Sequence, residues 1–273
     1  MYQCGLWRSA AVTMKKNKFQ PMITVIIPAR MASSRFPGKP LVSILGLPMV
    51  EHVRRRALLA HGIDLVVVAT CDESIKASVE SCGGRAVMTK DTHERCTDRV
   101  EEAMQMLPGD IVVMVQGDEP LLIPEAISQV VQPLLDDPEL EITNLLSPLE
   151  SSEDYGNPNI VKAVCDLNGN IIFLTRAPVP FFRHQIVVPV YRQTGIMAFC
   201  SAFLPYYSEL PETALEKAES VDMLRILENG IRIRGVITQY STNGVDQPGD
   251  VPVIESVLQT DHVQNKLFNQ ISQ

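Results

Sequence analysis

The sequence is poor in several features that mark large classes of proteins. Aromatic side chains make up 5% of the 273 residues, and no hydrophobic run approaches the roughly 20 residues that a membrane-spanning helix needs. The six cysteines are scattered, without a Cys-x-x-Cys pair or the Cys/His spacing of a zinc site. These absences argue against a membrane protein, a disulfide scaffold and a zinc domain, and they favour a reducing cytoplasm.

Two common nucleotide-binding fingerprints are also missing. No Gly-x-Gly-x-x-Gly follows the first apolar run, which argues against a dehydrogenase, and residues 31–36 contain no glycine, which excludes a Walker A loop. The formal net charge of −8 argues against nucleic acid or an anionic membrane as the main partner. With 45% hydrophobic residues, the chain can bury the core of one large α/β domain.

The first 21 residues differ from the rest. They are polar, contain Lys15, Lys16 and Lys18, and lack the apolar core of a signal peptide. We expect residues 1–21 to be a disordered or wrongly assigned N-terminal extension, with the true start at Met14 or Met22. Residues 22–273 are then a single domain.

Apolar runs and helical patterns alternate in the first half of this domain. Continuous apolar runs typical of buried parallel strands occupy residues 23–27, 65–70 and 111–115. Helical patterns occupy residues 48–62, 72–81, 100–106 and 124–135. This alternation predicts a Rossmann-like α/β fold with a mostly parallel sheet. In the first helix, the pattern directs Arg54, Arg55 and Arg56 outward.

The second half changes character. Residues 157–164 and 171–174 have the pattern of two antiparallel strands around Asn168-Gly169, a strong hairpin signal. We therefore expect an inserted antiparallel subdomain over about residues 155–200.

The loop after the first strand concentrates positive charge in an acidic chain. Arg30, Arg35 and Lys39 stand among small residues such as Ser33 and Gly38. Small residues let backbone N–H groups approach phosphate oxygens, while the cations neutralise their charge. An exposed basic loop is the alternative, and it is the commoner outcome for a charge cluster taken alone.

An acidic turn follows the strand at residues 111–115, with the order Gln116-Gly117-Asp118-Glu119. Ligands of open α/β sheets bind at the carboxyl ends of the strands. A carboxylate at such a position suits Mg²⁺, which prefers carboxylates, waters and substrate phosphates. The alternative is that Asp118 only caps the following backbone.

Residues 28–41 together resemble the nucleotide-binding signature of the 3-deoxy-manno-octulosonate cytidylyltransferases, a family of sugar nucleotidyltransferases. Further matches extend over residues 23–257, among them the segments at 93–99, 116–120, 175–181, 191–199, 215–225 and 244–250. The resemblance implies that an acceptor oxygen attacks the α-phosphorus of CTP and displaces pyrophosphate.

Roles for individual residues follow from this resemblance. Arg30, Lys39 and Asp118 are the implied catalytic residues, and Asp118 and Asp246 the implied ligands of Mg²⁺. The implied nucleotide-binding residues are Ala29, Arg30, Ser33, Arg35, Lys39, Thr97 and Gln116. The implied residues for an acidic sugar acceptor are Gln116, Arg176, Gln193, Glu219 and Asp222. The family also implies a homodimer, formed through residues 178–190.

Some positions depart from the family pattern. Arg95 and Cys96 replace a Ser-Gly pair, Gln193 replaces His, Met197 replaces Tyr and Met223 replaces Gln. Fewer polar partners would suit an acceptor other than Kdo, such as another ulosonic or nonulosonic acid or a phosphonate. Two further hypotheses stay open: Kdo itself as the acceptor, and a non-catalytic nucleotide-binding protein.

Overall fold

The computed structural model describes residues 20–33, 35–149, 151–184, 188–240 and 244–273. The expected N-terminal extension therefore lies almost entirely outside the described residues. No helix in the described part is long and apolar enough to cross a membrane.

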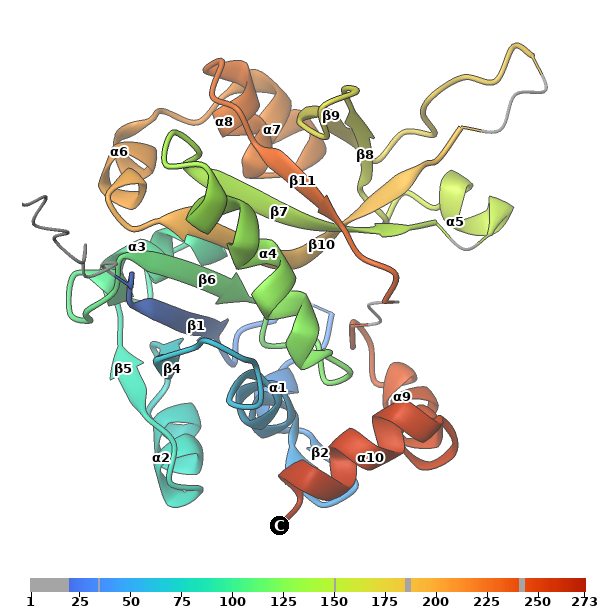
Figure 1. The fold of residues 1–273 in the computed structure, drawn as a ribbon. Coiled ribbons are helices and arrows are strands. Elements are labelled where there is room, and N and C mark those ends of the chain that lie inside the picture. The colour runs from blue at the N-terminus through green and yellow to red at the C-terminus, as the bar shows by residue number, and fades with distance from the viewer. Residues whose placement is uncertain (1–19, 34, 150, 185–187, 241–243) are drawn as a thin grey trace, which may run out of the picture.

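A twisted mixed sheet forms the centre of the molecule, with the order β11-β7-β10-β6-β1-β4-β5 (Figure 1). Its strands are β1 (Ile23–Ala29), β4 (Leu65–Thr70), β5 (Ala86–Met88), β6 (Ile111–Val115), β7 (Ile142–Pro148), β10 (Tyr191–Cys200) and β11 (Arg234–Ile237). β1 pairs in parallel with β4 and β6, β4 with β5, and β11 with β7, whereas β10 runs antiparallel between β6 and β7. The predicted mostly parallel α/β sheet is confirmed.

Helices cover both faces because the strands alternate their apolar side chains. Val25 and Ile27 face α1 (Met49–Ala57), α2 (Glu73–Ser81) and α4 (Pro124–Asp136), while Ile26 faces the other layer. That second layer contains α3 (Cys96–Met104), α6 (Phe203–Glu209), α7 (Ala214–Glu219) and α8 (Met223–Glu228). In Figure 1, α6, α7 and α8 lie above the sheet and α1 and α2 below it.

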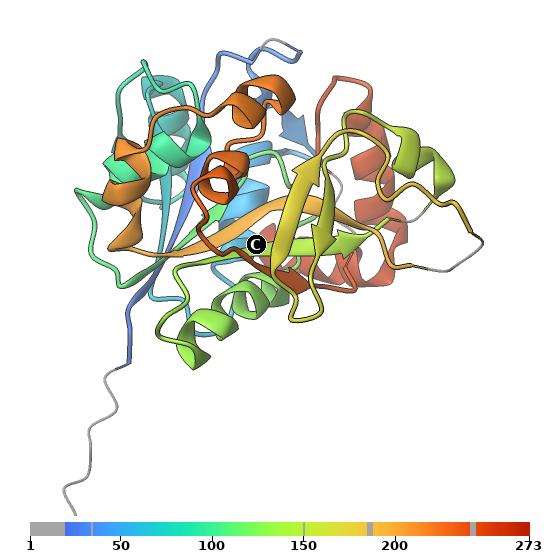
Figure 2. The ribbon, with the colours of Figure 1, turned by 90° about the horizontal axis from the view of Figure 1, so that it is seen from above.

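The predicted hairpin is present. Strand β8 (Lys162–Cys165) pairs antiparallel with β9 (Ile171–Thr175), and β8 also pairs with β10 at Ala163 and Tyr191 (Figure 2). The hairpin thus extends the main sheet through β10. Although β10 lies at the end of the range expected for the subdomain, it is a strand of the main sheet. A short helix, α5 (Ser152–Gly156), precedes the hairpin.

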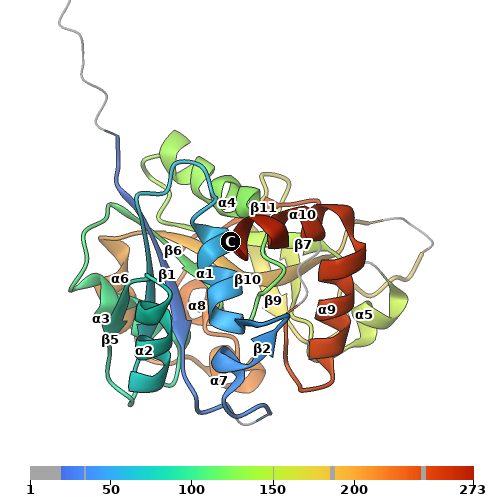
Figure 3. The same ribbon diagram turned by 90° about the horizontal axis from the view of Figure 1, so that it is seen from below.

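Short elements and two terminal helices complete the fold. A 3-10 helix η1 (Lys39–Leu41) and the strand pair β2 (Ser43–Ile44) and β3 (Leu47–Pro48) lead from the first loop into α1. The chain ends with α9 (Asp250–Thr260) and α10 (His262–Ile271), which lie beside α1 and β2 (Figure 3).

The outward direction predicted for the α1 arginines is wrong for two of them. Arg54 is 5% exposed and Arg56 is fully buried. Both Glu51 oxygens accept from Arg54 at 2.7 Å, and the Leu122 carbonyl accepts from Arg56 at 3.0 Å. The 3.6-residue pattern identifies the face of α1 that meets the sheet, but α4 and α10 also contact this helix.

Candidate active site

A cleft of about 250 Å³ lies at the carboxyl ends of β1 and β6. Its lining residues are Pro28, Ala29, Arg30, Ala32, Ser33, Arg35, Lys39, Pro40, Met49, Cys96, Gln116, Gly117 and Asp118. Seven residues predicted to bind the nucleotide or to catalyse line this one cleft: Ala29, Arg30, Ser33, Arg35, Lys39, Gln116 and Asp118.

The first loop is held in shape by its own backbone. The Met31 carbonyl accepts from the Gly38 N–H at 3.0 Å, and Gly38 has a positive φ of 77°, which glycine adopts without strain. The Met31 N–H donates to the Asp72 carboxylate at 2.8 Å, which ties the loop to the start of α2. Lys39 follows Gly38 directly, so this turn directs its side chain into the cleft.

Lys39 links three segments of the site. Its Nζ donates to Asp118 Oδ2 at 2.6 Å and to the Val245 carbonyl at 2.8 Å, and it lies 4.0 Å from Asp246 Oδ1. The lysine side chain is only 12% exposed. A cation between two carboxylates reduces their mutual repulsion, which helps Asp118 and Asp246 to lie on the same side of the cleft.

The two predicted metal carboxylates are brought together by backbone contacts. The Val245 N–H donates to the Asp118 carbonyl at 2.9 Å, so the segment with Asp246 lies directly against the end of β6. Asp246 also pairs with Arg35 at 2.9 Å. The carboxylate of Asp250 accepts the backbone N–H groups of Asp246 and Gln247 at 2.7 and 2.9 Å.

Aspartate is a common N-cap residue, but Asp250 does not cap α9. The N-cap of α9 is Gly249, and Asp250 is the first residue of the helix. Its side chain turns back to the preceding loop instead, where it supports the backbone of Asp246. A sequence pattern identifies the helix start to within a residue or two, but not the direction of the capping side chain.

The donor set suits Mg²⁺ better than metals that need a full protein cage. The described residues contain no group of three or more His, Cys, Asp or Glu arranged around a common metal position. Of the two predicted metal ligands, Asp118 lines the cleft, and Asp246 lies next to it, 4.0 Å from Lys39 Nζ. Mg²⁺ typically takes one or two carboxylates and completes its shell with water and substrate phosphates.

The turn after β6 leaves no room for larger side chains. A Cβ at Gly117 would lie 3.0 Å from the Pro28 carbonyl oxygen, so glycine allows β1 and β6 to approach here. Glu119 is half-buried beside Asp118. Burial, together with the Asp118 charge, raises the pKa of Glu119 to about 7. Glu119 was not among the predicted site residues, although its place in the acidic turn pointed to it.

The segment that departs from the family pattern is the start of a helix. α3 begins at Cys96, four residues earlier than predicted, and Arg95 precedes it in an extended conformation with φ −104°. No positive φ occurs at either residue, so glycine is not required here. Cys96 lines the cleft and donates from Sγ to Gln116 Oε1 at 3.4 Å. Burial raises the pKa of this thiol to about 11, which keeps it protonated.

Thr97 joins the predicted nucleotide side to the predicted acceptor side. Its hydroxyl donates to Asp222 Oδ2 at 2.7 Å, and Asp222 also accepts from the Met223 N–H at the start of α8. Neither residue lines the cleft itself. They lie behind Cys96, where α3 meets α8.

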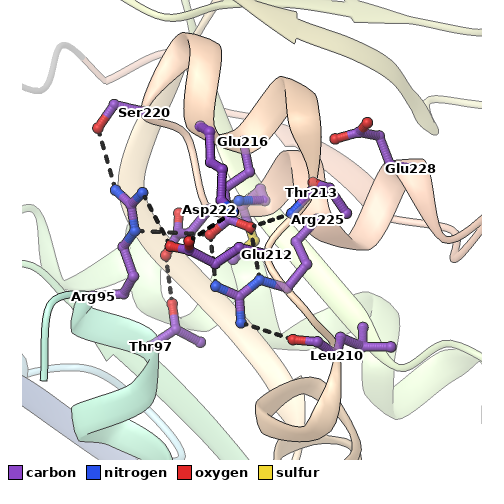
Figure 4. A network of polar contacts seen from close by, with 12 residues as sticks. Arg95, Thr97, Leu210, Glu212, Thr213, Glu216, Ser220, Asp222, Arg225 and Glu228 are labelled. Carbon is purple, nitrogen blue, oxygen red and sulfur yellow. Dashed lines mark hydrogen bonds and ion pairs between the residues drawn. The ribbon is translucent and has the colours of Figure 1, made fainter.

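A polar network surrounds this contact (Figure 4). Glu216 on α7 accepts two hydrogen bonds from Arg225 on α8, at 2.8 and 2.6 Å, and both residues are buried. The bidentate bond to Glu216 raises the pKa of Arg225 above its usual range. Arg95 donates to Ser220 Oγ at 3.2 Å and lies 3.7 Å from Glu216 Oε1. Arg95 therefore connects the start of α3 to the α7–α8 turn.

Arg176 and Glu219 contact each other. Glu219 accepts from the Thr175 hydroxyl at 2.5 Å and from the Arg176 N–H at 2.9 Å, and its carbonyl accepts from Arg176 Nε at 2.7 Å. Arg176 Nη1 donates to the Pro158 carbonyl at 3.0 Å. These two of the five residues predicted to bind the acceptor thus hold β9, α7 and the loop before β8 together.

The three replaced positions on the acceptor side lie in different surroundings. Met197 is 4% exposed and Met223 fully buried, and both pack in the hydrophobic cluster between the sheet and α8. Gln193 donates from Nε2 to Asn144 Oδ1 at 2.8 Å. The two methionines are core residues, so they give no support to an acceptor pocket with fewer polar groups.

Comparison with known proteins places the chain in a family. The family model described as Cytidylyltransferase matches residues 24–233. The chain belongs to the cytidylyltransferases. Among curated cytidylyltransferases, the 3-deoxy-manno-octulosonate cytidylyltransferase of Pelobacter propionicus is 43% identical over 84% of this chain and 94% of that relative. The enzyme of the same name from Geobacter sulfurreducens is 42% identical over 87% of this chain and 98% of that relative.

Solved structures agree with this cytidylyltransferase assignment. A CMP:2-keto-3-deoxy-manno-octonic acid synthetase complexed with CTP superimposes with a TM-score of 0.84 and 36% identity, over 88% of this chain and 99% of that chain. The 4-diphosphocytidyl-2C-methyl-D-erythritol synthase of Anaerococcus prevotii has a TM-score of 0.60 at 15% identity and shares the fold. The protein is therefore a nucleotidyltransferase of the 3-deoxy-manno-octulosonate cytidylyltransferase family, as the first loop predicted.

Proposed function

We propose that this cytidylyltransferase transfers CMP from CTP to 3-deoxy-manno-octulosonate (Kdo) and releases pyrophosphate. The observation that carries the proposal is the single cluster of Lys39, Asp118 and Asp246 beside the first loop. It occurs in a chain that is 42–43% identical to relatives named for this reaction. A similar structure is a synthetase of the same name complexed with CTP.

The residues of the cleft have distinct tasks in this proposal. Arg30, Arg35 and Lys39 bind the triphosphate and neutralise the charge that develops on the departing pyrophosphate. Asp118 and Asp246 would hold Mg²⁺. There a Mg²⁺ ion would neutralise phosphate charge and lower the pKa of the acceptor hydroxyl. An oxygen of the acceptor then attacks the α-phosphorus in line, and the bond to pyrophosphate breaks.

The acceptor side supplies orientation. Gln116 lies at the edge of the cleft and Thr97, Asp222, Glu219 and Arg176 behind it. We place the acidic sugar beside Gln116, on the side toward Gln193 of β10, whose amide would add a hydrogen bond. An acceptor held in one geometry reacts faster because its rotational and translational freedom is already lost.

We further propose that the enzyme works as a homodimer in the cytoplasm. Residues 178–184 and 188–190 carry apolar side chains into solvent, with Phe181 89% and Phe182 43% exposed. Phe182, Tyr155 and Ile237 line a neighbouring apolar groove of about 630 Å³. A second copy would cover this apolar surface. Light scattering on the purified chain tests the dimer, and a monomer at micromolar concentration contradicts it.

Pyrophosphate release tests the activity. The purified enzyme is incubated with Mg²⁺, each of four nucleoside triphosphates, and Kdo, other acidic sugars or phosphonates, while mass spectrometry identifies the product. We expect CTP with Kdo to give CMP-Kdo at the highest kcat/KM. A higher kcat/KM with another acid and CTP would identify that acid as the acceptor in place of Kdo. If no pair of substrates released pyrophosphate, the proposed transferase activity would be wrong.

A further inference from the structure

Strand β10 carries an irregularity beside the cleft. Its pairing with β7 advances from Gln193 opposite Leu146 to Met197 opposite Asn144, so three residues of β10 lie opposite one residue of β7. Residues 194–196, called the β10 bulge below, accommodate the difference. A bulge of this kind bends its strand and redirects the side chains next to it.

Asn144 on β7 is the residue that holds this bulge. It is fully buried, and its Nδ2 lies 3.1 Å from the Ile196 carbonyl and 3.2 Å from the carbonyls of Thr194 and Leu145. Carbonyl oxygens only accept hydrogen bonds, so these contacts require the amide nitrogen on this side. Asn144 Oδ1 is thereby directed to the Nε2 of Gln193, at 2.8 Å.

The β10 bulge in turn determines the position of Gln116. The Gly195 carbonyl accepts from the Gln116 N–H at 3.1 Å. A Cβ at Gly195 would lie 2.3 Å from Gln116 Cγ, so the two residues are in direct contact. Gln116 lines the cleft and accepts from Cys96 on its other side. Any shift of the bulge would therefore move Gln116.

A buried amide in the middle of a sheet is costly unless its hydrogen bonds are made. The amide of Asn144 makes them to the β10 bulge and to Gln193, apart from one contact to the neighbouring Leu145 carbonyl. An apolar residue would serve the surrounding core of Ile142 and Leu146 as well. The shape of the bulge is what requires asparagine.

We propose that Asn144 is a positioning residue of the transfer reaction, acting through the β10 bulge on Gln116 and Gln193. Asn144 is fully buried and does not line the cleft. Its effect on catalysis rests on the proposed function, whereas its effect on the bulge does not.

The test compares two buried neighbours on β7. Asn144→Leu keeps the side-chain size and removes every hydrogen bond to the bulge. Thr143→Val is the matched control, because Thr143 is also fully buried but its hydroxyl donates to the Val130 carbonyl of α4 at 2.6 Å, away from the bulge. Steady-state kinetics with CTP and Kdo, the Tm, and hydrogen exchange of residues 191–199 are measured for both variants.

We expect Asn144→Leu to raise the KM of CTP or Kdo about tenfold or more, as loss of buried hydrogen-bond partners near a site does. Residues 194–196 should exchange faster. Thr143→Val should lower the Tm with both KM values unchanged. Asn144→Thr, which keeps one hydroxyl donor for the bulge, should recover part of the lost affinity.

Two results would overturn the inference. One is a KM for both substrates within about twofold of wild type in Asn144→Leu. The other is hydrogen exchange over 191–199 that matches Thr143→Val. If Asn144→Leu does not fold, Asn144→Thr, which keeps only one donor to the bulge, is compared with wild type, and unchanged KM values and unchanged exchange over 191–199 there contradict the proposal. A wild-type enzyme without CMP transfer refutes the proposed function, while the exchange data still decide on the bulge.

Discussion

The proposed nucleotide side and the proposed acceptor side of this enzyme use charge in opposite ways. On the nucleotide side, Arg35 and Asp246 form an ion pair with 60% and 48% of their side chains exposed. On the acceptor side, Arg225 and Glu216 form a bidentate pair that is 5% and 0% exposed. In the first pair, Arg35 is free to bind phosphate and Asp246 to bind a metal ion, because both side chains are exposed. The second pair is buried and only stabilises the fold.

The difference in exposure between the two ion pairs separates residues that bind ligands from residues that stabilise the fold. An exposed ion pair adds little stability, so breaking it to bind a triphosphate costs little. A buried, hydrogen-bonded pair is expensive to disturb, and it holds α7 and α8 in one arrangement behind the site. The contrast predicts that substitutions on the nucleotide side alter catalysis and that those in the α7–α8 network alter stability.

The largest expected effect is at Asp118. Asp118→Asn removes a charged metal ligand and should reduce kcat about a thousandfold or more, roughly 4 kcal/mol in the barrier, with little change in Tm. EDTA should have the same effect on the wild type. Asp137→Asn, an exposed acid paired with Arg232, is the control. Retention of more than about a tenth of the activity in Asp118→Asn would contradict its role.

The buried pair should give the largest loss of stability. Arg225→Met leaves Glu216 uncompensated in the interior, and we expect the free energy of unfolding to fall by about 3 kcal/mol or more. Urea denaturation measures this loss. The folded fraction should bind CTP with unchanged affinity, and a CTP affinity that falls together with stability would show that the two sides are not separate.

Lys39→Ala should have an intermediate effect. Loss of its charge-assisted contacts should raise the activation free energy for CTP by about 1.5–3 kcal/mol, which lowers kcat/KM roughly 10- to 150-fold. The KM of Kdo should stay nearly unchanged. Arg30→Ala should act in the same direction. Steady-state kinetics with each substrate varied in turn distinguishes the two sides, and an effect confined to Kdo would move this loop to the acceptor side.

The smallest effect is expected at Arg95. Its ion pairs to Glu216 and Glu212 are long, at 3.7 and 3.9 Å, so Arg95→Ser should cost less than about 1 kcal/mol of stability. The KM of Kdo should change less than about threefold. Lys217→Ala, which removes another cation near Glu212, is the matched control. A tenfold change of KM in Arg95→Ser alone would mean that this arginine, and not the buried pair, orders the acceptor side.

Much of the fold was predictable because its signals are local. The strands at 65–70 and 111–115 were predicted with their observed bounds, since a continuous apolar run identifies a strand buried on both faces. The exposed first loop and the acidic turn were predictable for a related reason. Charged and small residues at the end of such a run have few structural uses.

Positions whose surroundings come from distant segments were harder to predict. Arg54 and Arg56 were expected in solvent, but Arg54 donates to the Cys82 carbonyl after α2 and Arg56 to the Leu122 carbonyl before α4. Met197 and Met223 suggested a changed acceptor pocket, yet both pack in the core between β10 and α8. Nothing in the local pattern around Asn144 distinguishes it from other polar residues, because its role depends on a bulge in another strand.

The sequence by itself determined the strand and helix order of the first half, the hairpin, the cationic loop, the acidic turn and the family, because each depends on residues close together in the chain. Only the tertiary structure decided which groups meet. Lys39 reaches the Val245 carbonyl across 206 residues, and Thr97 meets Asp222 across 125. Such contacts depend on how the strands are ordered and how the helices pack on them, and side-chain periodicity carries no information about either.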